Sequence, residues 1–277
     1  MPTTPVPPLR SPHVRLRPGV RVVARGRDRW QVGSVDGLAR VLPQQGAADR
    51  VVRALKGVGE VPDDPQARQV LTELAGAGLV ETRQDTDERG RRRCAARVRV
   101  LGTLGCDPAP LLGRAGVRAV RRPPADLVLR LCVGELPRSE TDQWVRAQLP
   151  HLVVRAMDGV VVLGPFVVPG RTACLRCLDS HRHDDDFEHP AVVERYVRAT
   201  AAPRADGAPE PVDLALATLA TAWAVRDALS FVEGGSPSTW SSTVTLGHAL
   251  AEVTAVSWLR HPACGCAWPE DSGTMEA

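Results

Sequence analysis

The stretch VVVLGPFVVPGRTACLRCLD, Val160–Asp179, decides the fold of the second half of the chain. Two apolar runs, Val160–Gly164 and Phe166–Val168, are separated by proline and glycine and are typical of buried strands. The pair Cys174 and Cys177 follows directly. The stretch therefore predicts strands of a sheet that lead into a close pair of thiols.

A second close pair, Cys264 and Cys266, is separated from Cys177 by 86 residues. A two-residue spacer lets both thiolates of one turn face one ion, and Gly265 lets the second pair curl as tightly. Each pair alone fits a redox pair or chance. Together they favour one Zn²⁺ held by four thiolates, in a chain whose other cysteines are Cys94, Cys106 and Cys132. Four protein ligands leave no open position, so we expect a structural zinc.

Working outward from these strands, the pattern indicates an α/β domain over residues 97–268, followed by a tail over 269–277. Arg97–Gly105 is an apolar strand that runs into a glycine turn, as at the start of a Rossmann unit. A long apolar helix is expected over Val212–Phe231. The other expected elements are strands at Val117–Val120, Leu127–Leu131, Leu152–Val154 and within Thr239–Leu259, and a helix at Glu140–Gln148.

The turn Gly102–Gly105 could hold a phosphate if a helix followed at once, but the residues around it argue against a nucleotide. An acidic ribose ligand is expected about 20 residues further on. There the sequence has Arg121 and Arg122. We therefore interpret Gly102 and Gly105 as a vestigial nucleotide loop.

The N-terminal part of the chain reads as a separate small domain over residues 14–83. Alternating apolar residues predict a hairpin around Gly26 and a third strand at Leu38–Leu42. Helices are expected over Ala47–Lys56 and after Asp64, where Pro65 marks a first turn. Three short strands followed by helices predict a winged-helix domain. A proline-rich, disordered lead-in over 1–13 precedes it, and a charged, solvated linker over 84–96 follows it.

Composition excludes several classes of protein. The chain has 277 residues, is 43% hydrophobic and 24% charged, and carries a net charge of +3, which is close to the globular average. No signal-peptide core and no membrane span are recognised in the sequence, so a cytoplasmic protein is expected. The charge is too small to indicate nucleic acid by itself. Lys56 is the single lysine, and asparagine is absent.

The segment His181–Asp186, with His189 beyond it, also contains metal-ligating residue types. We interpret this run of histidines and aspartates as a solvated charged loop after the cysteine pair, because a run of three aspartates has no defined ligand geometry. A metal site is the alternative.

The residues Val160–Asp179 and His261–Trp268 (HPACGCAW) resemble the zinc-bearing C-terminal half of ThiF-like proteins, the ubiquitin-activating-enzyme-like superfamily. The chain is similar there to the actinobacterial leader-peptide-binding, cyclodehydratase-like proteins of thiazole/oxazole-modified peptide biosynthesis. That group joins a winged-helix peptide-recognition domain to a degenerate Rossmann-like ThiF-type domain. The resemblance extends over nearly the whole chain from about Val14.

This resemblance implies a non-catalytic scaffold that binds a precursor or leader peptide and presents it to a YcaO-type cyclodehydratase or another modifying enzyme. Active relatives place Arg, Asn and Lys around the phosphates, and this domain lacks both Asn and Lys. The first alternative is an active adenylyltransferase that uses ATP. The second is a zinc-containing winged-helix DNA-binding regulator. The family also implies a homodimer, for which the helix Val212–Phe231 offers an apolar surface or simply a core.

The peptide site is expected along the third strand of the N-terminal domain. An edge strand has unpaired amides and carbonyls to which an extended peptide can add. The alternative is that the second domain covers this edge. The residues expected to bind the peptide are Leu38, Ala39, Arg40, Val41 and Leu42 on the strand, and Arg68, Gln69, Thr72 and Glu73 on the helix opposite.

Overall fold

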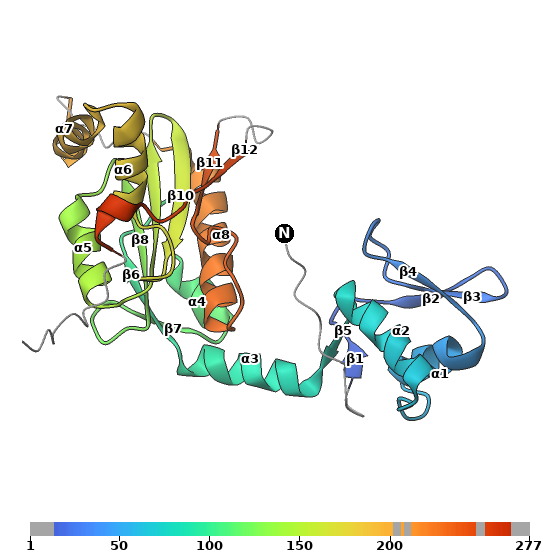
Figure 1. Ribbon diagram of the computed structural model, residues 1–277. Coiled ribbons are helices and arrows are strands. Elements are labelled where there is room, and N and C mark those ends of the chain that lie inside the picture. The colour runs from blue at the N-terminus through green and yellow to red at the C-terminus, as the bar shows by residue number, and fades with distance from the viewer. Residues whose placement is uncertain (1–13, 202–205, 208–211, 248–252, 267–277) are drawn as a thin grey trace, which may run out of the picture. The chain divides into compact units, whose positions relative to one another are not determined.

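The computed structural model describes residues 14–201, 206–207, 212–247 and 253–266. The chain divides into two compact units, Met1–Gly90 and Arg91–Ala277, each treated separately below (Figure 1). The expected lead-in over 1–13 and the tail over 269–277 lie outside the described residues.

The first unit is built on an antiparallel sheet in the order β2-β3-β4, with two helices that follow it. A separate pair of short antiparallel strands joins its two ends. The elements are β1 (Val14–Leu16), β2 (Val22–Arg25), β3 (Arg29–Val32), β4 (Arg40–Pro43), α1 (Gly46–Leu55), α2 (Pro65–Gly76) and β5 (Val80–Thr82).

The core of the first unit follows from the sequence pattern. Asp64 caps α2 by accepting a hydrogen bond of 2.9 Å from the amide of Ala67, and Pro65 occupies the first turn, where no amide partner is needed. Leu71 and Leu74 on the buried face of α2 pack in one cluster with Val32 of β3. Both helices and all three strands of the sheet therefore match the expected elements.

The segment expected as a solvated linker is a helix, α3 (Arg83–Ala95), none of whose residues is buried. Its charges repeat at helical spacing, as in the pairs Asp85 with Arg89 and Asp87 with Arg91. Opposite charges four residues apart stabilise an exposed helix. The segment is exposed as expected, but the spacing of its charges favours a helix.

The second unit is a mixed sheet in the order β12-β11-β10-β9-β8-β6-β7. Strands β7, β6, β8 and β9 are parallel, and β10, β11 and β12 are antiparallel additions. The strands are β6 (Arg97–Leu101), β7 (Arg118–Val120), β8 (Leu127–Val133), β9 (His151–Met157), β10 (Val160–Val167), β11 (Ser242–Leu246) and β12 (Val253–Ser257).

One expectation for this sheet is wrong. The two strands predicted on either side of Gly164 form a single strand, β10, with a register shift between Leu163 and Phe166. Gly164 has a φ of +94°, and a Cβ there would overlap the carbonyl oxygen of Ser242. The glycine and proline therefore make a bulge within one strand, which the apolar pattern alone does not distinguish from a turn.

Helices cover both faces of the sheet (Figure 1). Helix α8 packs through Ala217, Ala220 and Ala224 against a core that includes β8, β9 and β10. It is long and apolar enough to cross a membrane by length and composition, but this packing is that of a core helix. The helices are α4 (Ala109–Arg114), α5 (Arg138–Arg146), α6 (Leu175–Asp185), α7 (His189–Ala201), α8 (Leu214–Val232) and the short 3-10 helix η1 (Pro262–Cys264).

Candidate functional site

The four paired cysteines meet at one point in the second unit. Cys174 caps the N-terminus of α6 and Cys177 lies in its first turn, while Cys264 ends η1. Gly265 has a φ of +74°, the left-handed conformation that turns the chain so that Cys266 comes back to the same point. The expected convergence of the two pairs is thus present in the geometry.

The sulfur positions suit a tetrahedral metal. The Sγ–Sγ distances are 3.7 Å for Cys174–Cys177, 3.5 Å for Cys174–Cys264 and 3.4 Å for Cys177–Cys266. A zinc ion with Zn–S bonds of about 2.3 Å separates its sulfurs by about 3.8 Å. The donor set therefore fits a structural zinc.

The glycine turn after β6 packs closely against the neighbouring strand. In an open parallel sheet a ligand lies beyond the carboxyl ends of the strands, at the point where the strand order reverses, here between β6 and β8. Gly102, with a φ of +77°, follows β6, and a Cβ there would overlap the carbonyl of Leu131 and lie 2.9 Å from Nη1 of Arg130. The first glycine of the turn thus abuts β8.

Two further glycines, Gly105 and Gly134, also lie close to neighbouring elements. A Cβ at Gly105 would lie 2.8 Å from Cβ of Ala217 on α8, and one at Gly134, after β8, would overlap Thr200 of α7. The Thr200 hydroxyl also accepts a hydrogen bond of 3.2 Å from the amide of Glu135. These glycines therefore permit close packing between elements of the chain.

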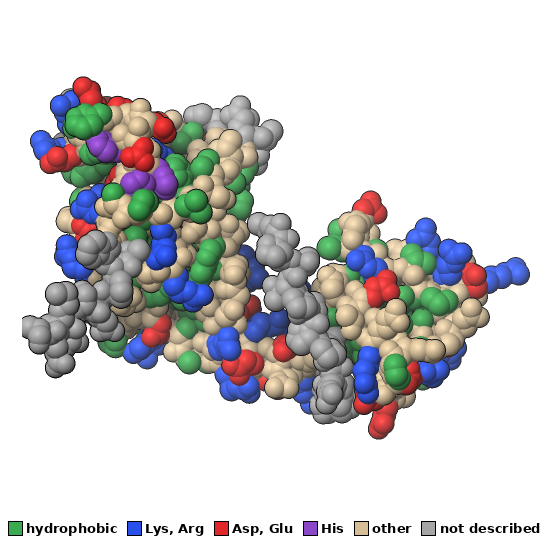
Figure 2. Space-filling view, in the orientation of Figure 1, with side chains coloured by type: hydrophobic (Ala, Val, Ile, Leu, Met, Phe, Trp, Pro, Cys, Tyr) green, Lys and Arg blue, Asp and Glu red, His purple; other side chains and the backbone are tan. Residues whose placement is uncertain are grey.

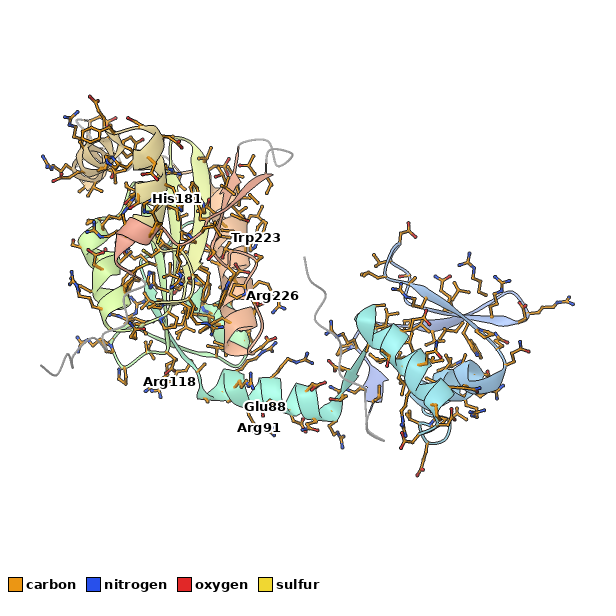
Figure 3. The ribbon with its side chains drawn as sticks, viewed as in Figure 1. Glu88, Arg91, Arg118, His181, Trp223 and Arg226 are labelled. Atoms are coloured by element: carbon orange, nitrogen blue, oxygen red, sulfur yellow. The ribbon has the colours of Figure 1, made fainter. Side chains whose placement is uncertain are left out.

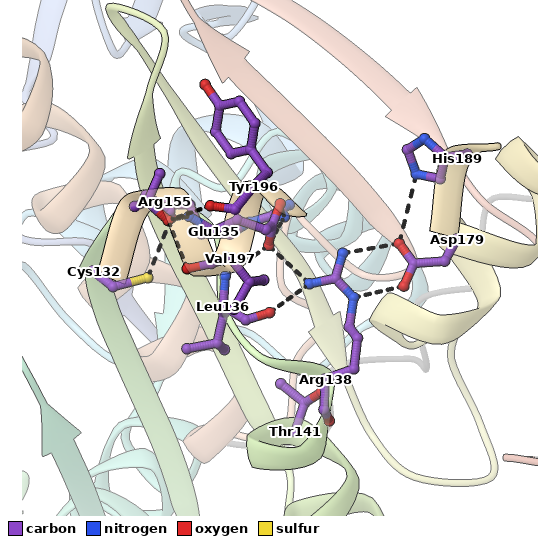
Figure 4. A network of polar contacts seen from close by, with 12 residues as sticks. Cys132, Glu135, Leu136, Arg138, Thr141, Arg155, Asp179, His189, Tyr196 and Val197 are labelled. Carbon is purple, nitrogen blue, oxygen red and sulfur yellow. Dashed lines mark hydrogen bonds and ion pairs between the residues drawn. The ribbon is translucent and has the colours of Figure 1, made fainter. Parts of the chain in front are cut away.

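A buried chain of ion pairs lies at the carboxyl ends of β8 and β9 (Figure 4). Glu135 accepts from Arg155 at 2.6 Å and from Arg138 at 2.8 Å, and Arg138 donates to both carboxylate oxygens of Asp179 on α6, at 2.6 and 2.8 Å. Burial raises the pKa of Glu135, but Arg155 and Arg138 outweigh it and bring it to about 2. The network fixes α5 and α6 to the sheet.

The thiol beside this network is not set up as a nucleophile. Cys132 lies on β8, and burial raises its pKa to about 11. A nucleophilic cysteine needs a pKa lowered towards neutrality. Cys132 is therefore a neutral, partly buried side chain at physiological pH.

In the first unit, β4 lies at one edge of the sheet β2-β3-β4 and has no strand partner on its outer side among the described residues. The amide of Gln44 donates to the carbonyl of Asp28 at 2.7 Å, and the register pairs Gln31 with Val41. Because hydrogen-bonded and non-bonded pairs alternate in antiparallel strands, the N–H and C=O of Val41 point away from β3. Val41 therefore presents its backbone at the open edge.

The structure changes the expected roles of several residues at this edge. The strand begins at Arg40, so Leu38 and Ala39 lie before it, in a turn whose carbonyls accept hydrogen bonds of 3.0 and 3.1 Å from Nη1 of Arg40. Nε of Arg40 also lies 3.8 Å from Glu73 on α2. Arg40 thus ties the turn and α2 to β4, and Glu73 already partners the cation that was expected to meet an acidic peptide.

The remaining expected contacts lie along α2. Arg68 forms an ion pair with Asp63 at 2.8 Å, and the hydroxyl of Thr72 bonds the carbonyl of Arg68 at 2.8 Å. Gln69 is exposed. Leu42 points into the core, where it is 5% exposed. The exposed apolar side chains near this edge are Val35, Leu38 and Val41.

Comparison with known proteins places this fold among solved structures. No family model and no curated protein matches the chain. It is similar to E. coli MccB in a crystal structure with a form of MccA, with a TM-score of 0.63, 12% identity, and coverage of 92% of this chain and 99% of MccB. It is similar to the heterocyclase TruD, with a TM-score of 0.62, 17% identity, and coverage of 92% of this chain and 42% of TruD.

A crystal structure of E. coli MccB with ATP is also similar, with a TM-score of 0.57, 12% identity, and coverage of 92% of this chain and 100% of MccB. At these identities the likeness shows the fold. It agrees with the Rossmann-like, ThiF-type architecture expected from the sequence, at the level of overall fold. The chain spans less than half of TruD.

Sequence reasoning missed the helices α6 and α7. The segment His181–Asp186 was expected as a loop, but α6 extends to Asp185. The network of Glu135, Arg138 and Asp179 was also missed, because its members lie far apart in the chain and each is an ordinary charged residue in sequence. The spacing of Leu175 and Leu178, which are buried on α6, was the signal available for this helix.

Proposed function

We propose that this chain is a non-catalytic peptide-binding protein that presents a precursor peptide to a modifying enzyme, of which a YcaO-type cyclodehydratase is the expected kind. The observation that carries the proposal is the pair Arg121 and Arg122, which directly follows β7, where an acidic ribose ligand is expected. A domain with the fold of MccB but without that acidic group would keep a docking surface and lose ATP chemistry.

The residue composition of the second unit supports the same proposal. Phosphoryl-site catalysis depends on positioned charge and a metal ion. The second unit has neither lysine nor asparagine. Cys132 is neutral and the paired cysteines are assigned to zinc. The zinc, when bound, supplies a cross-link between α6 and the segment after β12, and no chemistry on a substrate.

The first unit supplies the binding surface. A winged-helix module would receive the peptide as a further strand on β4, where the outward N–H and C=O of Val41 are the backbone partners. Apolar peptide side chains would meet Val35, Leu38 and Val41, which are 61, 51 and 41% exposed. That MccB has been crystallised with MccA supports a peptide as the ligand class for this fold.

The proposed assembly is a homodimer formed through the second unit. Leu214 and Leu219 on α8 are 65 and 40% exposed although the opposite face of the helix is in the core. Burial of two such surfaces against each other would remove this apolar area from water.

The alternative function is an adenylyltransferase, favoured by the likeness to MccB crystallised with ATP. The test is an ATP–pyrophosphate exchange assay on the intact chain, with peptides selected against it from a phage-displayed library as substrates. The proposal predicts binding of one of these peptides with no exchange. Exchange above the no-protein blank would establish the alternative. Binding of duplex DNA in place of peptide would instead favour a winged-helix regulator.

A further inference from the structure

The C-terminal half of α6 holds the segment that carries the second cysteine pair. Nε2 of His181 lies 2.9 Å from the carbonyl oxygen of Leu259, and Oδ2 of Asp184 lies 2.9 Å from Nε2 of His261. Figure 3 shows His181 on α6 beside η1, and Figure 2 shows histidine side chains gathered over this helix. We call His181, Asp184 and His261 the α6 clamp.

The clamp has the composition of a second metal site, since its three ligand atoms lie within 4.8 Å of one another. The hydrogen bonds argue against that role. The amide of Ala263 donates to Nδ1 of His261 at 3.2 Å. An amide N–H can only donate, so Nδ1 must hold a lone pair and the ring proton of a neutral imidazole must be on Nε2. That proton is donated to Asp184, and no lone pair of His261 remains for a metal.

The hydrogen bonds of His261 also fix the conformation of the turn at Cys264. The His261 ring caps η1 through Ala263, and its carbonyl accepts from the amide of Cys264 at 3.1 Å. His261 is 9% exposed, so its ring is fixed in position. The ring of His181 meets it edge to face, with centroids 4.8 Å apart.

We propose that Asp184 and His261 are positioning residues that hold Cys264 and Cys266 in place to receive zinc. The inference rests on the proposed zinc site. Helix α6 carries Cys174 and Cys177 at its start and His181 and Asp184 one to two turns later, so one rigid element contacts both pairs of ligands. Cys264 and Cys266 are then already ordered in the folded chain before zinc binds. Because zinc binding does not have to order them, less of the intrinsic zinc affinity is lost.

The test is the zinc affinity of the intact chain, measured by competition with a chromogenic chelator. Asp184→Asn and His261→Ala are expected to weaken zinc binding about 10- to 100-fold, the usual effect of residues that orient metal ligands. Asp185→Asn is the matched control, because Asp185 is exposed on the same helix, and its affinity should equal wild type. His261→Asn restores a side-chain acceptor for the turn and should recover part of the loss.

Cobalt substitution separates positioning from ligation. At saturating Co²⁺, every variant should keep the thiolate-to-cobalt charge-transfer band and one metal per chain. Equal zinc affinities in wild type, Asp184→Asn and His261→Ala would overturn the inference. So would two metals per wild-type chain that fall to one in Asp184→Asn. A wild-type chain that binds no zinc would overturn the zinc assignment itself, and the inference with it.

Discussion

Replacing Val41 with proline removes one backbone donor from the open edge of the first unit. The Val41 amide points away from β3, so Val41→Pro leaves the hydrogen bonds between β3 and β4 in place. Pro43, two residues on at the same outward position, shows that the strand accepts proline there. If a peptide adds to this edge, it loses one hydrogen bond worth about 0.5–1.5 kcal/mol. That loss corresponds to a Kd raised about 2- to 12-fold.

The assay is calorimetric titration of a peptide selected against the intact chain from a phage-displayed library. Ala24→Pro is the matched control, because the Ala24 amide points out from β2 at the opposite edge of the same sheet. Val41→Ala keeps the amide and tests the side chain alone. A Val41→Pro chain that melts like wild type and binds the peptide with unchanged Kd would refute the placement on β4. An equal loss in Ala24→Pro would point to the other edge.

Three further predictions concern stability and assembly. Cys264→Ser should lower the Tm of the zinc-loaded second unit by about 6–12 °C. Loss of a thiolate ligand costs about 3 kcal/mol or more, and each kcal/mol lowers the Tm of a unit of this size by about 2–4 °C. An unchanged Tm would contradict the zinc site. Burial lowers the pKa of His151 to about 4, below its ordinary 6.5, so this residue contributes stability above pH 6.5 that is lost as the pH falls through 4. The loss is about 3 kcal/mol. Urea unfolding at a series of pH values should therefore show a free energy of unfolding that changes less between pH 6.5 and pH 4 in His151→Gln than in wild type. Light scattering at micromolar concentration should give a dimer, and Leu214→Glu on α8 a monomer; a wild-type monomer would contradict the interface.

Local signals in the sequence were sufficient for most of the elements. The cap at Asp64, the alternation through β3 and β4, and the apolar pattern of α8 each act over a few residues and agree with the structure. The close approach of Cys174, Cys177, Cys264 and Cys266 was also predicted, because thiol pairs at these spacings have few other uses.

The sequence pattern did not predict interactions between residues that lie far apart in the chain. Gly164 looks like a turn in sequence, and only the closeness of Ser242 on β11 makes it a bulge. Arg40 looks free in sequence, and only the fold brings Glu73 to it. The charged run of α3 was interpreted as solvated from its polarity, while the spacing of its charges at four residues carried the helical signal.

The most direct test of the account is a calorimetric titration of Mg·ATP into the zinc-loaded chain saturated with its peptide. The account predicts no saturable heat, because the second unit has neither lysine nor asparagine and carries Arg121 and Arg122 where an acidic ribose ligand is expected. Saturable, magnesium-dependent binding of ATP in the micromolar range would contradict it and identify the second unit as a nucleotide-binding domain.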